Sequence, residues 1–179
     1  VTPFQNGAVC TRSVDKMIDF HLEAGTHGLL VAGTTGEAAT LSDEEYLSLI
    51  QQVVRRVNGA VPVVVGTGTN ATTSSITRTR TAAHNGAPYA LVAPPYYNKP
   101  TPAGLIAHFT TVADASPIPI VLYNVPSRTG TNMQPDTVVT LAAHKQVVAV
   151  KEASGSMAQV ARTLAALPPD VSLLSGDDA

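Results

Sequence analysis

A chain of 179 residues is long enough to bury a substantial core, and 44% hydrophobic with 13% charged residues is the composition of an ordinary globular protein, not a disordered one. The net charge of −2 gives no reason to expect nucleic acid or an anionic membrane as a partner, and no apolar run approaches the roughly 18 residues that a membrane span needs. A single cysteine, Cys10, excludes an internal disulfide framework and fits a reducing compartment, so we expect a cytoplasmic protein.

The first part of the chain predicts the end of a strand, a helix and a complete strand. Val1-Thr2-Pro3-Phe4 resembles the tail of a strand. Apolar residues that share one helical face follow Ser13, and Gly25 is a typical stop for that helix. Leu29–Ala32 is then an apolar run with the length of a buried strand.

Helix and strand patterns keep alternating in the middle of the chain. Ser42-Asp43-Glu44-Glu45 is a capping-box sequence that opens a helix, and Asn58-Gly59 ends it. The next strand is expected over Val61–Val65. Thr72–Asn85 predicts a weaker helix because threonine is abundant there, and Ala90–Ala93 predicts another strand.

The last part of the chain repeats the same alternation. Thr101-Pro102 places a proline at the first position of a helix, and Ile118–Tyr123 predicts the following strand. Pro135 opens a further helix. Two more apolar runs, Val147–Val150 and Val171–Leu174, complete the series of strands.

These strands are mostly about 25 to 32 residues apart, which is the length of one βα unit. Because they are apolar throughout, they suit a parallel sheet covered on both faces. Two α/β architectures fit: an open doubly wound sheet, and a (β/α)₈ TIM barrel that is incomplete in this chain. We favour the barrel, present here from the end of strand 1 through about strand 7.

Both ends of the chain look cut. It begins on the strand-like Val1-Thr2-Pro3-Phe4 and stops on Ser175-Gly176-Asp177-Asp178, just past another strand, whereas eight units would need roughly 240 residues. We therefore predict a single (β/α) barrel domain over residues 1–179, truncated at both ends. Since an unclosed barrel exposes strand edges and apolar interior, we expect these residues alone to fold poorly and to lack activity.

Reactive side chains follow the predicted strands, where parallel α/β proteins place their sites. Gly33-Thr34-Thr35-Gly36-Glu37 offers two hydroxyls and glycine-flanked amides that can hold a carboxylate, although it is also a plausible plain turn. Gly66–Ala71 matches the dinucleotide fingerprint G-x-G-x-x-A, but no acidic residue occurs from Tyr46 through Ala113 to bind a ribose. The sequence therefore argues against nucleotide binding at that loop.

Two later loops carry phenols and a guanidinium. Prolines stiffen the loop around Tyr96 and Tyr97, where tyrosines can move protons or simply pack. Tyr123 ends a predicted strand, and Arg128, five residues later, suits a carboxylate, although a surface arginine is the ordinary alternative.

Lys151 is the most informative single residue, because it alone of the four lysines follows a strand-like run. A partly buried amine loses its proton more readily and can then attack a carbonyl carbon, although a lysine at a strand end can also extend to solvent. With the phenols, hydroxyls and arginine expected on the same rim, the set suits Schiff-base chemistry on a small carboxylated carbonyl compound. The histidines are scattered and no cluster has metal-ligand spacing, so we predict no metal.

The motifs around these residues resemble those of the 4-hydroxy-tetrahydrodipicolinate synthases (dihydrodipicolinate synthases), a family within the pyruvate-dependent class I lyase/aldolase superfamily. The resemblance runs the whole length, with the motifs in the family's order and at its spacing. They are Gly33–Glu37, Pro95–Asn98, Tyr123–Gly130, Lys151–Ala153 and Ser175–Asp178.

This resemblance implies condensation of pyruvate with L-aspartate 4-semialdehyde in lysine and diaminopimelate biosynthesis, in a homodimer or homotetramer and without a cofactor beyond the covalent pyruvate imine. It implies a role for each matching residue. Lys151 matches the Schiff-base lysine, and Tyr123 matches the phenol that shuttles protons. Thr34 matches the hydroxyl that links this phenol to a tyrosine of the neighbouring subunit, and Tyr97 matches that tyrosine. Thr35 matches the residue that binds the pyruvate carboxylate, Arg128 the residue that receives the semialdehyde carboxylate, and Gly176 a further residue that lines the site.

Two alternatives and one departure accompany this prediction. The chain could instead be a related lyase, such as an N-acetylneuraminate lyase or a keto-sugar-acid aldolase, or a catalytically silent ligand-binding homologue. Thr35 and the segment after Tyr123 argue against the first, and the presence of Lys151 and Tyr123 argues against the second. Family members inhibited by lysine usually carry a histidine and a glutamate where this chain has Tyr46 and Ser74, so we expect no feedback inhibition by lysine.

Overall fold

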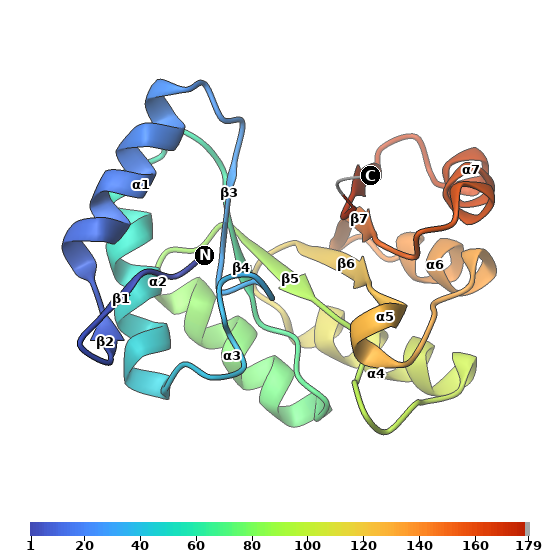
Figure 1. Cartoon of the computed structure of the whole chain (residues 1–179). Coiled ribbons are helices and arrows are strands. Elements are labelled where there is room, and N and C mark those ends of the chain that lie inside the picture. Colours follow the sequence, from blue (N-terminus) through green and yellow to red (C-terminus); the bar gives the residue numbers. More distant parts are fainter. Residues whose placement is uncertain (178–179) are drawn as a thin grey trace. The chain divides into compact units, whose positions relative to one another are not determined.

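The structure, a computed structural model, describes residues 1–177, and most of its strands belong to one six-stranded sheet (Figure 1). Along this sheet every strand neighbours the next one in the chain, in the order β3-β4-β5-β6-β7-β8. An open doubly wound sheet would reverse its order at a switch point, so the observed order is that of a (β/α) barrel. The predicted (β/α)₈ class, incomplete in this chain, is confirmed. The strands are β3 (Leu29–Val31), β4 (Val63–Gly66), β5 (Tyr89–Val92), β6 (Ile120–Asn124), β7 (Val147–Glu152) and β8 (Ser172–Ser175).

Strand boundaries differ from the prediction by a few residues, for identifiable reasons. The strands β4 and β6 start after Pro62 and Pro119, because proline has no N–H to give to a neighbouring strand. The strand β7 runs two residues beyond the predicted Val150, so that Lys151 lies within the strand and not after it. Its pairing with β8 on one side and β6 on the other extends through Glu152.

Seven helices are assigned within the described residues, and five of them were predicted. Two were missed: α5, a single turn, and α7. The helix α1 begins at Thr11, two residues before the predicted Ser13. None of these helices is long and apolar enough to cross a membrane. They are α1 (Thr11–Glu23), α2 (Asp43–Val57), α3 (Thr72–His84), α4 (Pro102–Ala115), α5 (Pro126–Thr129), α6 (Pro135–Ala142) and α7 (Met157–Ala166).

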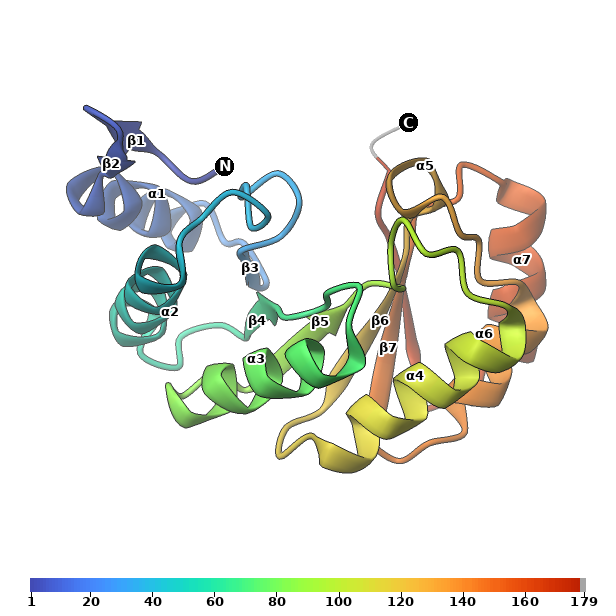
Figure 2. The ribbon, with the colours of Figure 1, turned by 90° about the horizontal axis from the view of Figure 1, so that it is seen from below.

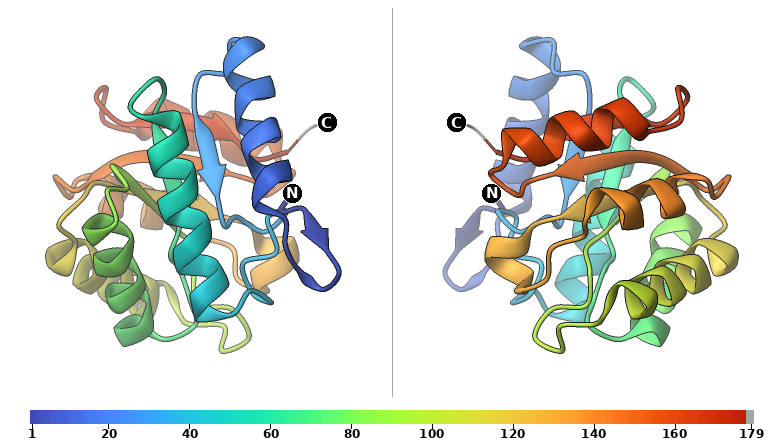
Figure 3. Two further views of the ribbon diagram at one scale, coloured as in Figure 1. Left: turned by 90° about the vertical axis from the view of Figure 1, so that its left-hand side faces the viewer. Right: turned by 90° about the vertical axis from the view of Figure 1, so that its right-hand side faces the viewer.

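The chain forms two compact units, of which the first comprises Val1–Gly66 and Thr81–Ala90. In this unit α1 and α2 lie side by side (Figure 3, left). The guanidinium of Arg56 forms a two-pronged ion pair with Asp19, with distances of 2.8 and 2.6 Å. Gln52 donates to the Thr11 carbonyl at 2.7 Å and to the Asp15 carboxylate at 2.8 Å. These contacts fix the two helices that precede and follow β3.

The start of the chain differs from the predicted strand tail. No strand is assigned over residues 1–3, and Phe4–Gln5 (β1) pairs with Ala8–Val9 (β2) in an antiparallel ribbon outside the six-stranded sheet. A strand is defined by pairing with a neighbour, and within the described residues Val1–Pro3 have no such pairing.

The second unit comprises Thr67–Arg80 and Leu91–Ala179, of which residues up to Asp177 are described. Its helices α6 and α7 pack against each other, and α6 also contacts β7 and α4 (Figure 2). The side chains at the centre of this unit are almost completely buried; the largest are Phe109, Leu105, Ile120, Leu122, Met133, Val92, Val112, Val138 and Val150.

Two glycines, Gly66 at the end of β4 and Gly68 just after it, are required by close packing of the backbone. A Cβ on Gly66 would lie 2.0 Å from the carbonyl oxygen of Ala32, within the first unit. A Cβ on Gly68 would lie 2.4 Å from the backbone nitrogen of Ala93, within the second. Neither position accepts a side chain without displacing backbone.

Candidate active site

The register between β6 and β7 places Tyr123 directly beside Lys151. The Lys151 Nζ lies 4.4 Å from the centroid of the Tyr123 ring, in cation–π range. The Tyr123 side chain is buried and Lys151 is half-buried, so the amine is held against the phenol instead of extending freely into water. Each is the last residue but one of its strand, and because they are paired in register, both point to the same face at the same level.

The segment after β8 contributes Gly176, which has no side chain, to this part of the site. Gly176 donates its N–H to the Glu152 carbonyl at 2.8 Å, which brings it close to the end of β7. A Cβ on Gly176 would lie 3.0 Å from the Lys151 Cε and 2.8 Å from the Ala153 Cβ. The glycine therefore leaves the room in which the lysine side chain lies. Of the Ser175–Asp178 motif, Asp178 lies outside the described residues.

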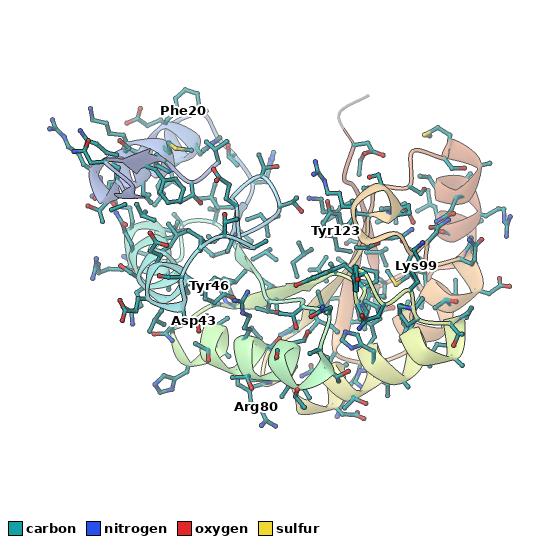
Figure 4. The ribbon with its side chains drawn as sticks, turned by 60° about the horizontal axis from the view of Figure 1, so that its bottom comes forward. Phe20, Asp43, Tyr46, Arg80, Lys99 and Tyr123 are labelled. Carbon is teal, nitrogen blue, oxygen red and sulfur yellow. The ribbon has the colours of Figure 1, made fainter. Side chains whose placement is uncertain are left out.

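The loop that carries Tyr96 and Tyr97 has an unusual backbone. Tyr97 has φ +72° and Lys99 φ +49°, in the left-handed region that non-glycine residues seldom adopt. Tyr97 is 88% exposed, so residues 1–177 leave its side chain largely uncovered. The stem of Lys99 lies against Gly130, at 3.2 Å from Cε to the position of a Cβ there (Figure 4 labels Lys99 and Tyr123).

Arg128 lies on α5, the single turn that follows β6. Pro126 occupies the first position of this turn, and Gly130 ends it in a left-handed conformation. The hydroxyl of Thr129 accepts from the Thr131 N–H and shares its one proton between the Val125 and Thr131 carbonyls, which stabilises the turn. The Arg128 side chain is exposed.

Thr34 and Thr35 lie in a turn of the first unit, after β3. Both are exposed, and the turn is bounded by Ala32 and Glu37, which have φ values of +51° and +60°. The buried hydroxyl of Thr2 donates to the Gly36 carbonyl at 2.7 Å and holds the turn. The structure thus brings Tyr123, Lys151 and Gly176 together within the second unit and presents the two threonines on a strained turn of the first.

Sequence reasoning missed a cluster of buried polar side chains next to the lysine. Asn124 pairs in register with Glu152, and both are buried. The Asn124 Nδ2 donates to both carboxylate oxygens, at 3.0 and 3.1 Å, and Gln159 Nε2 donates to one of them at 3.2 Å. The available signal was a polar residue at the end of each of two apolar strands, one position after Tyr123 and one after Lys151.

Tyr46, the residue at one expected effector position, is buried. Its hydroxyl donates to the Gly66 carbonyl at 2.9 Å, which ties α2 to the end of β4. Within residues 1–177 no group of three or more His, Cys, Asp or Glu side chains is arranged to hold a metal ion.

Comparison with known proteins gives one consistent match. Residues 1–179 match the model of the dihydrodipicolinate synthetase family. The 4-hydroxy-tetrahydrodipicolinate synthase of Trichlorobacter lovleyi is 48% identical over 178 residues, which are 99% of this chain and 61% of that relative. The chain therefore spans about 61% of the length of this curated relative.

Solved structures agree with this match. The dihydrodipicolinate synthase of Thermotoga maritima superposes with a TM-score of 0.98 at 39% identity, over 99% of this chain and 62% of that one. The chloride-inhibited dihydrodipicolinate synthase of Acinetobacter baumannii in complex with pyruvate gives a TM-score of 0.97 at 41% identity, with the same coverage of 99% and 62%.

Proposed function

The chain belongs to the dihydrodipicolinate synthetase family, and on this premise we propose that it condenses pyruvate with L-aspartate 4-semialdehyde to give 4-hydroxy-tetrahydrodipicolinate, a step of lysine and diaminopimelate biosynthesis. The observation that carries the proposal is the Lys151 amine held 4.4 Å from the centre of the Tyr123 ring. An amine and a phenol at this spacing supply the nucleophile and the proton carrier that imine formation needs.

The reaction begins at Lys151. Its neutral amine attacks the keto carbon of pyruvate, and the resulting carbinolamine loses water to form an imine. The Tyr123 phenol delivers and removes the protons of these steps. Loss of a methyl proton converts the imine to an enamine, whose carbon attacks the aldehyde carbon of the semialdehyde. The amino group of that second substrate then displaces Lys151 and closes the ring.

The remaining predicted residues bind the substrate carboxylates, leave room for the lysine or relay protons. Thr35 holds the pyruvate carboxylate, and Gly176 leaves room for the bound lysine. Thr34 links Tyr123 to a Tyr97 from a neighbouring subunit, which is supported by the exposure of the Tyr97 ring. Arg128 receives the carboxylate of the semialdehyde, because an exposed guanidinium suits bidentate binding.

The proposal involves no cofactor besides the imine on Lys151 and no nucleic-acid or membrane partner. It includes a homodimer or homotetramer with Tyr97 shared across subunits, acting in the cytoplasm. It also includes insensitivity to lysine, since Tyr46 and Ser74 stand where lysine-inhibited members usually carry a histidine and a glutamate. An assay with added lysine checks this last point, and inhibition at millimolar lysine would contradict it.

Borohydride trapping tests the function on the full-length protein. Incubation with pyruvate and borohydride should add a reduced pyruvate group to Lys151, located by peptide mass spectrometry, and Lys151→Arg should abolish it. A coupled assay with aspartate 4-semialdehyde should then show turnover. Trapping without turnover would indicate a different Schiff-base lyase, and absence of trapping would refute the proposed function.

A further inference from the structure

Directly beyond Lys151 lies a buried carboxyl group to which the chemistry above gives no role. The Glu152 side chain belongs to a residue only 2% exposed, in the strand that carries the lysine. Successive residues of a strand point to opposite faces, so Lys151 and Tyr123 share one face while Glu152 and Asn124 share the other. Burying a carboxylate is costly unless hydrogen bonds satisfy it, so this group requires an explanation.

The hydrogen bonds to Glu152 come from neutral N–H groups on three segments. Its Oε1 accepts from the Ser154 N–H at 2.8 Å and from Asn124 Nδ2 at 3.0 Å. Its Oε2 accepts from Asn124 at 3.1 Å and from Gln159 Nε2 at 3.2 Å. A carboxylate, which only accepts, fits this set of donors, whereas an amide of the same shape does not.

Backbone groups of Met133 fix the direction of these bonds. The Met133 N–H donates to the Asn124 Oδ1 at 2.9 Å, so the Asn124 amide must turn its Nδ2 towards Glu152. The Met133 carbonyl accepts from Gln159 Nε2 at 3.1 Å, which orients Gln159 in the same way. Asn132 and Gln159 exchange a further pair of bonds, at 2.9 and 3.0 Å. The donors around the carboxylate are therefore set by the fold.

The network ties together the segments that carry the site. Asn124 is the last residue of β6, one position after Tyr123, and Asn132 and Met133 follow the turn that carries Arg128. Gln159 belongs to α7. The backbone carbonyl of Glu152 also accepts from Gly176. Thus Glu152 bonds directly to the residue after Tyr123 and to Gly176, and through Asn124 and Gln159 it is linked to Asn132 and Met133, which follow the turn that bears Arg128.

We propose that Glu152 is a positioning residue for the imine chemistry: its carboxylate, through Asn124 and Gln159, holds Lys151 against Tyr123. The proposal rests on the proposed function for its chemical consequence, but the arrangement it describes exists without substrate. Fully satisfied buried networks specify one geometry, and misplacement of a reacting group by about 1 Å can cost about a hundredfold in rate.

The test compares Glu152→Gln with Thr79→Val in the full-length protein. Glu152→Gln keeps the shape of the side chain but replaces an acceptor oxygen with an NH2 group, which cannot accept the bonds of the surrounding N–H donors. The second removes a buried 2.8 Å hydrogen bond between Thr79 and Thr67, neither of which bonds to Glu152, and controls for lost stability. We expect Glu152→Gln to slow borohydride-trapped imine formation at saturating pyruvate by about tenfold or more, with half-saturation little changed. Thr79→Val should trap at the wild-type rate, and Glu152→Asp should recover part of the loss.

A second readout needs no substrate. An amine-acylating reagent labels accessible lysines, and peptide mass spectrometry gives the ratio of labelling at Lys151 to labelling at the exposed Lys16, Lys99 and Lys145. Release of the network should raise that ratio by about threefold in Glu152→Gln and leave it unchanged in Thr79→Val. Slower imine formation together with greater labelling in Glu152→Gln, when Thr79→Val shows neither, separates loss of positioning from general destabilisation.

The outcomes separate the two proposals. If the wild type forms no pyruvate imine, the proposed function fails, and the labelling ratio alone decides the positioning role. If the wild type is trapped and Glu152→Gln matches Thr79→Val in both readouts, the positioning role is refuted. Should Glu152→Gln fail to fold, Gln159→Met removes one donor and should shift both readouts in the same directions to a smaller extent. No shift in that variant would equally overturn the proposal.

Discussion

At the scale of single residues, the space around the Lys151 side chain depends on Gly176, which has no side chain. Gly176→Ala places a methyl group 3.0 Å from the Lys151 Cε and 2.8 Å from the Ala153 Cβ, so the lysine stem must move. We expect imine formation with pyruvate to slow by about tenfold or more, because the amine leaves its place beside Tyr123. Borohydride trapping measures the rate.

The matched control for this substitution is Gly104→Ala on α4. Its new Cβ would lie 3.4 Å from the Pro100 Cβ, an ordinary contact, and alanine in a helix is favoured over glycine by roughly 0.5–1 kcal/mol. That variant should trap pyruvate like the wild type. Equal rates for both alanine variants would show that Gly176 does not set the room for Lys151.

A buried histidine makes the stability depend on pH. His108 on α4 shares a 2.9 Å hydrogen bond between its Nδ1 and the Thr72 hydroxyl, and burial lowers the pKa of its imidazole. Below pH about 6.5 the His108 imidazole is protonated in the unfolded chain, whereas in the folded chain it stays neutral down to its lower pKa. The free energy of unfolding should therefore fall as pH drops from about 6.5 towards the folded pKa, by about 1.4 kcal/mol for each pH unit between the two values.

Urea unfolding of the full-length protein at a series of pH values checks this prediction. His108→Gln removes the titrating group and should flatten the fall in stability on the acid side. His84→Gln changes an exposed histidine at the end of α3 and should leave the curve of the wild type. Identical curves for all three proteins would contradict a role for His108.

At the scale of elements, α2 is stabilised by a reciprocal cap at its start. The Ser42 hydroxyl accepts from the Glu45 N–H at 3.1 Å, and the Glu45 carboxylate accepts from the Ser42 N–H at 2.9 Å. Ser42→Ala should lower the free energy of unfolding by about 1 kcal/mol, measured in urea. Glu45→Gln keeps an acceptor in place and should cost less, so a larger loss in that variant would argue against the cap.

The elements themselves were largely predictable, because each strand is an uninterrupted apolar run and most helices have clear start signals. The strand starts were not, since Pro62 and Pro119 delay pairing after the apolar residues begin. The helix α7 was missed because it leaves Met157 and Leu164 exposed, which blurs the usual one-sided apolar pattern.

The candidate site was predictable in its residue types but not in its arrangement. Lys151 and Tyr123 are recognisable from their places after apolar runs, but their contact depends on the register between β6 and β7, which local sequence does not encode. The network around Glu152 could not be predicted for the same reason: the two side chains that donate to its carboxylate lie 28 residues before it and 7 residues after it, and only the fold aligns their amides.

At the scale of the whole molecule, the proposed site is shared between subunits, and this makes complementation possible. Lys151→Ala and Tyr97→Phe should each lower turnover strongly when expressed alone. A mixed dimer contains one site with an intact Lys151 and an intact Tyr97 from its neighbour, so co-expression should restore part of the activity. If Tyr97 instead served its own subunit, the mixture would stay as inactive as the separate variants.

Gly66 and Gly68, at the end of β4 and just after it, also constrain which substitutions such chains can accept during evolution. A side chain at Gly66 would clash with the Ala32 carbonyl, and one at Gly68 would clash with the Ala93 backbone nitrogen, so packing and not a ligand requires these glycines. Selection on folding alone should therefore keep both glycines in descendants of this chain, whatever those descendants catalyse. The two glycines of the G-x-G-x-x-A pattern can thus be retained because of backbone packing, without any nucleotide binding. Substitution of Thr67 or Thr69 would leave both glycines in place.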